Sequence, residues 1–422
     1  MKILYISQYF PPEMGAPAAR VGELSSRWVG EGHDVTVLTG FPNHPTGRLA
    51  KGYRGKLWRL MLKENVNGIK VVRTWLLPFP NRKTFERLLN YSSFCASSSL
   101  TGLFLSRPDV VIATSPQLLV GLSGWWLARF RRVPFVFEVR DLWPESLVAV
   151  GVGDERSMMY RCLAAIANFL YRRADRIVVV TEAFKDYLVE KKRIAADKIV
   201  VVQNGVETDL FDPASLRQTL KSELGLERKF VVSYIGTMGM AHGLEKVLEA
   251  AMRLQETHPG IAFLFVGEGA DRERLISLAG SMKLRNVRFE PEQSRERIPH
   301  YICSSDVCLV LLKKREIFKT VIPTKMLEFM ACARPVILGV DGQARKIIEN
   351  AKAGIFVSPE SASDLIEAVV KMASDPVLCA QLGHNGRKYV QQHFSRQQTA
   401  RIYGEFLERL LGIESAHPPV AA

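Results

Sequence analysis

The chain carries, at residues 323–337, the segment PTKMLEFMACARPVI. Pro323 stands where a helix would begin, and its fixed φ suits the first helical position. The residues after it are apolar on nearly every side of such a helix, which indicates that the helix is buried. Lys325 and Glu328 interrupt this pattern on one face, and carboxylates are rarely buried without a partner. These two residues therefore either neutralise each other or line a polar pocket, where a helix N-terminus would attract an anion.

Strand-like apolar runs alternate with helical patterns on both sides of this segment. The expected strands form two series, 2–6, 34–39, 69–73, 109–113, 134–138, 176–180 and 199–202, then 230–235, 262–266, 286–289, 307–311, 335–338 and 355–357. Repeated strand–helix units predict an α/β protein with parallel sheets and helices on both faces. The turn signal at 204–206 separates two doubly wound domains, and ligands in such sheets bind at the carboxyl ends of the strands.

Charge is distributed unevenly along the chain. The net charge of the 422 residues is +14, and residues 1–205 account for +12 of it, with 29 Lys and Arg against 17 Asp and Glu. A basic first half suggests an anionic partner, which we expect to be a nucleic acid, an anionic membrane surface or a lipid phosphate. Six cysteines without metal-ligand spacing, and a start that lacks a signal-peptide pattern, predict reduced thiols in the cytoplasm.

Glycines follow two strands of the second series. The loop 236–243 contains Gly236, Gly239 and Gly243 between a strand and a helix, as a phosphate-binding loop would. It matches neither the Walker pattern nor the dinucleotide fingerprint, so alone it is a weak signal, and His242 is equally well explained as an ordinary loop residue. Gly267 ends the next strand, and the strand after that ends in a candidate nucleobase site, Phe289-Glu290-Pro291.

Two strand ends of the first series also carry polar residues. The loop 9–20 includes Glu13, Gly15 and Arg20, which are candidates to contact a substrate, although a plain strand–helix loop explains them equally well. The block Arg140-Asp141-Leu142-Trp143-Pro144-Glu145 gathers charged groups around an aromatic ring, a composition typical of a site rather than a core.

Two apolar stretches, 86–106 and 118–132, lie beside basic residues. The first follows Arg82 and Lys83, and the second ends in Trp125-Trp126-Leu127-Ala128-Arg129-Phe130-Arg131-Arg132. Either stretch alone is explained by a core helix with solvated basic ends. The charge of this half favours peripheral contact with a membrane.

Several catalytic classes find no support. The chain lacks GxSxG, HExxH and an acidic DxD pair, so no metal site is predicted. We expect Lys side chains, backbone N–H groups and helix dipoles to stabilise charge on a leaving phosphate.

Motifs along nearly the whole chain resemble those of glycosyltransferase family 4, which has the GT-B fold. The matching segments are the opening strand and loop, 32–37, 204–207 with Phe211, 236–243, 267–269, 323–337 and 393–395. The blocks 141–146 and 323–325 are similar to those of the branch with the O-antigen fucosaminyltransferases. The resemblance implies two Rossmann-like domains facing across a cleft, with the last helix crossing back. The expected boundaries are 1–205 with 395–413 for acceptor binding, 206–394 for the nucleotide-sugar, and 414–422 as a flexible tail.

The resemblance also implies roles for individual residues. Glu328 matches the family's second glutamate, which binds the ribose, whereas Thr320 stands in place of the first, which contacts the donor sugar. Thr237 and His242 replace the Arg and Lys that hold the diphosphate in many members. Lys325 is the natural substitute, with Thr324 beside it and Lys319 as a second candidate. Asp141 falls about where many members place a histidine near the reacting sugar, and Glu145 is expected to position hydroxyl groups with it.

The function implied is a retaining, metal-independent glycosyltransferase without a cofactor. It would move a sugar from a nucleoside diphosphate sugar, preferably a UDP-sugar, to a lipid-linked or glycan acceptor in cell-surface polysaccharide assembly. Its partners would be an undecaprenyl-linked or similar acceptor, held by Glu13, Gly15, Arg20 and Arg140, and the inner face of the cytoplasmic membrane. A GT-B sugar-nucleotide 2-epimerase and a basic nucleic-acid-binding protein are the alternatives.

Overall fold

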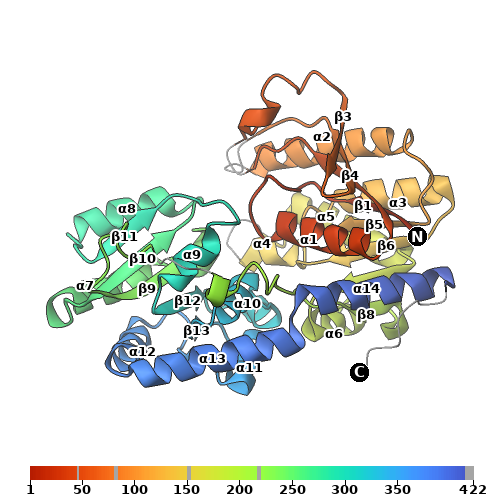
Figure 1. The fold of residues 1–422 in the computed structure, drawn as a ribbon. Helices are drawn as coiled ribbons and strands as arrows, with labels where there is room; N and C mark the ends of the chain where they lie inside the picture. Colours follow the sequence, from red (N-terminus) through yellow and green to blue (C-terminus); the bar gives the residue numbers. More distant parts are fainter. Residues whose placement is uncertain (45–46, 80–83, 150–153, 216–219, 414–422) are drawn as a thin grey trace. The chain divides into compact units, whose positions relative to one another are not determined.

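The computed structural model describes residues 1–44, 47–79, 84–149, 154–215 and 220–413. The chain forms two compact units, one of Met1–Asn204 with Arg396–Ala422 and one of Gly205–Ser395 (Figure 1). The expected flexible tail 414–422 and the basic residues Arg82 and Lys83 lie outside the described residues.

The first unit is built on a sheet with the strand order β3-β4-β2-β1-β5-β6-β7-β8. Its strands are β1 (Lys2–Ile6), β2 (Asp34–Gly40), β3 (Met61–Val66), β4 (Ile69–Thr74), β5 (Val110–Thr114), β6 (Phe135–Val139), β7 (Arg176–Val179) and β8 (Ile199–Val201). All neighbours are parallel except β3 and β4. The central strands are buried on both faces, which is why they appear in the sequence as continuous apolar runs.

Strand β3 is missing from the expected strands, and the prediction of a purely parallel sheet is wrong at this edge. Its residues alternate between exposed and half-buried, so β3 offers no apolar run. It pairs with β4 through a turn in which Asn67 and Gly68 have φ angles of 51° and 83°. An Asn-Gly pair of this kind is the strongest local signal for a hairpin, and it would have identified β3.

Helices cover both faces of this sheet (Figure 1). Helix α14 (Arg396–Leu411) packs on α1 (Ala16–Gly30), where Trp28 Nε1 donates a hydrogen bond of 3.0 Å to the carbonyl oxygen of Ala400. This contact confirms that the last helix returns to the first unit. The other helical elements are η1 (Lys51–Tyr53), α2 (Thr84–Gly102), α3 (Val120–Arg131), α4 (Glu145–Ala149), α5 (Met158–Arg173), α6 (Glu182–Glu190) and η2 (Ala196–Lys198).

A buried ion pair joins α1 to the sheet. The guanidinium of Arg20 lies 2.9 Å from a carboxylate oxygen of Glu138, and both side chains are at most 1% exposed. Its other donors bond to the carbonyl oxygens of Val202 and Gln203 and to the side chain of Asn204. All five N–H groups of Arg20 are thus used inside the unit, so the prediction that Arg20 contacts an acceptor is wrong.

The second unit has a parallel sheet with the strand order β11-β10-β9-β12-β13-β14. Its strands are β9 (Phe230–Ile235), β10 (Ile261–Val266), β11 (Val287–Glu290), β12 (Val307–Leu311), β13 (Val336–Gly339) and β14 (Gly354–Phe356). Its helical elements are η3 (Pro213–Ser215), η4 (Met240–His242), α7 (Glu245–Thr257), α8 (Arg272–Ser281), α9 (Ile298–Cys303), η5 (Glu316–Thr320), α10 (Thr324–Ala331), α11 (Gln343–Ala351), α12 (Ala362–Ser374) and α13 (Pro376–His393). Both units are therefore α/β and doubly wound, as predicted.

Removing the cation of the buried ion pair should destabilise the protein strongly. We expect Arg20→Met to lower the free energy of unfolding by about 3–5 kcal/mol, because it leaves Glu138 charged and buried. The exposed pair of Arg285 and Glu256 offers a control, since Arg285→Ala should cost less than about 1 kcal/mol. Urea unfolding at pH 7 measures both values. Equal losses in the two variants would contradict the structural role of Arg20.

Candidate functional site

The order of strands reverses at the centre of the second sheet. From β9 the chain proceeds to β10 and β11 on one side, and it then returns to β12, which pairs with the other edge of β9. Parallel α/β sheets bind ligands at the carboxyl ends of strands where the order reverses. The loop 236–243 follows β9 and the segment that leads to α10 follows β12, so both predicted donor elements begin at this point.

Backbone hydrogen bonds hold the strand ends on the β11 side together. Gly236 N donates to Val266 O at 2.9 Å, and Gly267 N donates to Glu290 O at 3.1 Å. Gly267 has a φ of 138°, and a Cβ atom there would collide with the carbonyl group of Gly236. The two glycine turns thus pack backbone against backbone, which only glycine permits at this position.

Lys325 projects from the first turn of α10 toward the end of β9. Its Nζ donates a hydrogen bond of 2.8 Å to the hydroxyl of Tyr234 and lies 4.0 Å from the centroid of that ring. The Tyr234 hydroxyl in turn donates to the carbonyl oxygen of Thr237 at 2.6 Å. A Cβ atom on Gly236 would approach Lys325 Nζ to 2.8 Å, so the glycine keeps the ammonium against the loop. The structure therefore brings Lys325, Gly236 and Thr237 together, as predicted for a phosphate site.

Burial lowers the pKa of Lys325 to about 7, and Glu328 opposes this shift. The sequence left two options for these charges, mutual neutralisation or a polar pocket. In the structure each has another partner, because Glu328 accepts a hydrogen bond of 2.5 Å from Arg295 while Lys325 bonds to Tyr234. Burial thus disfavours the charged form of Lys325, and an anionic ligand beside it would stabilise that charged form strongly.

His242 serves the architecture of the loop. Its Nδ1 lies 3.0 Å from the carbonyl oxygen of Leu311 at the end of β12, and burial with the nearby Lys325 lowers its pKa to about 3. A neutral ring that donates from Nδ1 to this carbonyl keeps Nε2 as an acceptor. In this state His242 offers no N–H donor to a phosphate, and its contact with the sugar donor stays a prediction.

Glu328 and Arg295 form the polar side of α10. The guanidinium of Arg295 also lies over the ring of Phe211, 4.7 Å from its centroid. Phe211, which belongs to the family motif near the domain boundary, thus supports the partner of Glu328. The Glu328 side chain is 12% exposed, which leaves part of its carboxylate accessible to a ligand.

The remaining donor-side residues are more scattered. Lys319 is exposed and forms an ion pair of 2.8 Å with Glu316. Phe289 stacks on Phe265 at 4.9 Å and packs against the core, so its ring supports β11 more than it offers a face to a base. Thr324 opens α10, Gly239 is the residue before η4, and Pro291 is exposed. Strand β11 lies two strands from β9, so its end lies roughly 10 Å from Gly236, a separation that suits a nucleotide.

In the first unit, Arg140 links the end of β6 to the start of α1. Its Nη2 donates to the carbonyl oxygen of Ala16 at 3.0 Å, and its backbone N–H donates to Ser115 Oγ at 2.8 Å. Burial lowers its pKa to about 10, so it is charged at pH 7. Gly15, with a φ of 108°, caps α1 next to Ala16. The two predicted acceptor segments, 9–20 and 140–146, therefore meet at the carboxyl ends of β1 and β6.

Glu13 links the loop after β1 to the loop after β2 by hydrogen bonds. Its buried carboxylate accepts hydrogen bonds from the backbone N–H groups of Asn43 and His44, at 2.9 and 3.0 Å, and of Phe10 at 3.4 Å. Burial raises the pKa of Glu13 to about 7, although these hydrogen bonds act to lower it. These hydrogen bonds give Glu13 a structural role, which does not depend on a bound acceptor.

The two candidate acids of the block 141–146 have different surroundings. Asp141 accepts a hydrogen bond of 3.2 Å from Trp143 Nε1, and burial raises its pKa. Glu145 accepts hydrogen bonds through one oxygen from the Tyr187 hydroxyl at 2.9 Å and from Lys192 at 2.6 Å, which fastens α4 to α6. Asp141 is the better placed of the two for a substrate, because its contacts are local.

Tyr234 and Arg295 are site residues that the sequence analysis did not single out. Tyr234 stands inside the apolar run of β9, so its pattern is that of a core residue. Arg295 lies 33 positions before Glu328, and no local signal connects the two. Across the described residues, no group of three or more His, Cys, Asp and Glu side chains is arranged to hold a metal ion.

Comparison with known proteins identifies relatives of both units. The glycosyl transferase 4-like domain matches residues 15–205, and glycosyl transferases group 1 match residues 217–389. A putative colanic acid biosynthesis glycosyl transferase of Escherichia coli, WcaI, is 24% identical over 416 residues, which cover 96% of this chain and 98% of its own.

Two solved structures illustrate the likeness in fold. Sucrose-phosphate synthase from Thermosynechococcus elongatus has a TM-score of 0.77 at 20% identity, covering 97% of this chain and 99% of its own. Anabaena HepE in complex with UDP-glucose has a TM-score of 0.71 at 17% identity, covering 97% and 100%. The family matches span both units and the fold agrees over nearly the full length, so the chain belongs to the family 4 glycosyltransferases of the GT-B fold.

Proposed function

We propose that this protein transfers a sugar from a nucleoside diphosphate sugar, preferably a UDP-sugar, to a lipid-linked or glycan acceptor in cell-surface polysaccharide assembly. The observation that carries the proposal is the ammonium of Lys325 held against Gly236 where the strand order reverses. Two relatives support it, since WcaI is named for colanic acid biosynthesis and HepE is described in complex with UDP-glucose. The closer likeness to O-antigen fucosaminyltransferases stays a prediction.

The donor would lie along the carboxyl ends of β11, β10 and β9. Its base would reach the segment Phe289-Glu290-Pro291, its ribose would contact Glu328, and its diphosphate would lie between the loop 236–243 and Lys325. The amides around Gly239 and the N-terminus of α10 at Thr324 add partial positive charge to the same place. Lys325 is charged in this complex, because the diphosphate offsets the burial that disfavours its ammonium form.

The reaction we propose keeps the configuration at the anomeric carbon and needs no metal. The bond between that carbon and the diphosphate oxygen breaks, the acceptor oxygen bonds to the same face, and the acceptor proton passes to the departing diphosphate. Lys325 and the loop amides stabilise the charge on the leaving group, which is the largest electrostatic demand of this step. Asp141 and Arg140 are proposed to position the acceptor.

We further propose that the first unit acts at the inner face of the cytoplasmic membrane. No helix of the described residues is long and apolar enough to cross a bilayer. Helices α2 and α3 pack together, and large apolar side chains on them or just after α2 are exposed, namely Leu100, Phe104, Trp126 and Phe130. Arg129 in α3 and Arg132 directly after it are exposed as well. Apolar side chains next to cations on a strongly basic unit suit an anionic membrane surface.

The first test is the thermal stability of the protein with UDP, GDP, ADP and their common sugar conjugates. A nucleoside diphosphate at about 100 times its dissociation constant should stabilise the fold by about 2.7 kcal/mol. We expect a selective rise with UDP. Formation of an epimer from a UDP-sugar alone would favour the 2-epimerase, and stabilisation by none of the nucleotides would contradict the donor site.

Binding of UDP should be coupled to the uptake of a proton. At pH 8 the Lys325 side chain is mostly neutral in the free protein, since its pKa is about 7, and the bound diphosphate raises this pKa. Titration calorimetry in buffers of different ionisation enthalpy should show uptake on the order of one proton, and affinity should fall as pH rises from 7 to 9. Lys325→Met should abolish the uptake, whereas Lys319→Met should retain it. Proton uptake that persists in Lys325→Met would contradict the role of Lys325 as the partner of the diphosphate.

Catalysis should depend on the same ammonium. We expect Lys325→Ala to reduce kcat by roughly 100-fold or more, as for the loss of a contact that stabilises a developing anion. Initial rates with a saturating donor measure this effect, and Lys319→Ala is the matched control on the adjoining segment. Full activity of Lys325→Ala would remove it from the mechanism.

A further inference from the structure

Tyr234 carries a hydroxyl group into the core of the second unit. It lies in β9, is 1% exposed, and its ring lies 6.3 Å from that of Phe265 between centroids. A phenylalanine would supply the same ring for this packing. Because a buried hydroxyl costs free energy unless it is hydrogen-bonded, the partners of this hydroxyl indicate what it does.

The hydrogen bonds of this hydroxyl run in one direction. Its only proton is donated to the carbonyl oxygen of Thr237 at 2.6 Å, so its oxygen accepts the bond of 2.8 Å from Lys325 Nζ. Burial raises the pKa of Tyr234 well above its ordinary value of 10, so the hydroxyl keeps its proton at pH 7. The ammonium of Lys325 is thereby connected through one neutral hydroxyl to the backbone of the glycine loop.

The ring of Tyr234 acts on the same ammonium. Lys325 Nζ lies 4.0 Å from the ring centroid, within range of a cation–π interaction. The ring and the hydroxyl oxygen both favour a charged ammonium over a neutral amine, so they oppose the burial that lowers the pKa of Lys325 to about 7. Among the described residues, the other titratable groups coupled to this charge are Glu328, which pairs with Arg295, and the neutral His242 in η4. Tyr234 is therefore the partner in direct contact with the ammonium.

Tyr234 is also fixed more firmly than the side chain that it contacts. Its strand pairs with β10 on one side, where Tyr234 is in register with Phe265, and with β12 on the other. The long side chain of Lys325 is flexible, and it loses conformational entropy when a ligand first orders it. Holding the ammonium in place before binding removes part of that cost from the affinity.

We propose that Tyr234 is a positioning residue of the diphosphate site, which holds the Lys325 ammonium beside Gly236 and favours its charged form before the nucleotide binds. The inference rests on the proposed function, since Tyr234 acts only through Lys325. In the structure as described, the hydroxyl uses one of the three N–H donors of the ammonium, which leaves two for oxygen atoms of the diphosphate. A carboxylate in the same place would compete with the diphosphate by its charge, whereas a neutral hydroxyl does not.

The pH dependence of UDP binding tests this role. Tyr234→Phe keeps the ring and removes the acceptor, so the pKa of Lys325 in the free protein should fall by about 1 below its wild-type value. At pH 5.5 Lys325 is mostly charged in both proteins, and titration calorimetry should give affinities for UDP within about threefold of each other. At pH 8 the charged fraction is about tenfold smaller in the variant, so its binding of UDP should be about tenfold weaker. Protonation of UDP itself affects both proteins equally.

Two further measurements separate this role from an effect on packing. Tyr389→Phe removes a hydroxyl from α13 of the same unit, and it should bind UDP like the wild type at both pH values. In a Lys325→Met background, Tyr234→Phe should change the affinity for UDP at pH 8 by less than about twofold, because the hydroxyl then has no ammonium to hold. Thermal unfolding without ligand verifies that each variant is folded.

The outcomes distinguish this inference from the proposed function. A loss of affinity in Tyr234→Phe that is equal at the two pH values, or no loss at either, would overturn the positioning role while the donor site stands. A loss of about tenfold at pH 8 in the Lys325→Met background would overturn it too, since the effect would then not pass through Lys325. If the wild type binds no UDP at either pH, the donor site itself fails, and the role of Tyr234 fails with it.

Discussion

The reversal of strand order between β9 and β12 determines where this protein can bind an anion. Neighbouring parallel strands normally continue in one direction, and their connecting helices cover the space beyond them. Here the connections leave β9 and β12 in opposite directions. The glycine loop after β9 and the N-terminus of α10 after β12 can therefore approach each other, and Lys325 lies where they meet.

Two buried or partly buried cations show how differently such a charge can be used. Arg20 has a carboxylate partner and no donor left over, so it contributes to stability and is closed to ligands. Lys325 bonds to the neutral hydroxyl of Tyr234 and lies against a loop of backbone groups, while Glu328 on the same helix pairs with Arg295. A cation without close compensation raises the free energy of the unliganded fold, and a bound diphosphate recovers that free energy as affinity.

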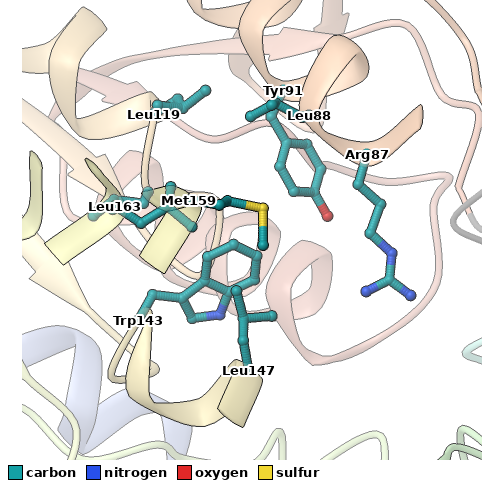
Figure 2. Close-up of a pocket in the computed structure, with 9 residues that line it drawn as sticks. Arg87, Leu88, Tyr91, Leu119, Trp143, Leu147, Met159 and Leu163 are labelled. Carbon is teal, nitrogen blue, oxygen red and sulfur yellow. The ribbon is translucent and has the colours of Figure 1, made fainter. Parts of the chain in front are cut away.

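The first unit combines two chemistries at one edge of its sheet. Arg140 and Asp141 follow β6 and are charged. Trp143, two residues after Asp141, contributes its ring to an apolar pocket (Figure 2). Such a change over a short segment suits a substrate that is itself divided into polar and apolar parts. The basic composition of this unit acts over a longer range, because it favours any anionic surface that presents such a substrate.

Much of the architecture followed from local patterns. The parallel strands were predictable because strands buried on both faces must be apolar throughout, and the glycine loop and α10 were predictable from turn and helix signals. The edge strand β3 was not predicted, because a strand exposed to solvent keeps charged residues and lacks an apolar run, although Asn67-Gly68 marked its hairpin. Lys325 and Gly236 could be singled out because a strand-end glycine and a helix-start lysine are local features, and the structure places them side by side; their contact with a phosphate stays a prediction.

What the sequence by itself determined is the fold class, the two α/β units and the segments that surround the donor site. The partners of charged side chains were decided only by the tertiary structure. Arg20 was predicted to contact a ligand and forms an internal ion pair with Glu138. His242 bonds to Leu311, and Glu328 pairs with Arg295 rather than with Lys325. The physical reason is that backbone conformation and burial patterns repeat over a few residues, whereas an ion pair or hydrogen bond depends on which distant side chains the packed core brings within 3 Å.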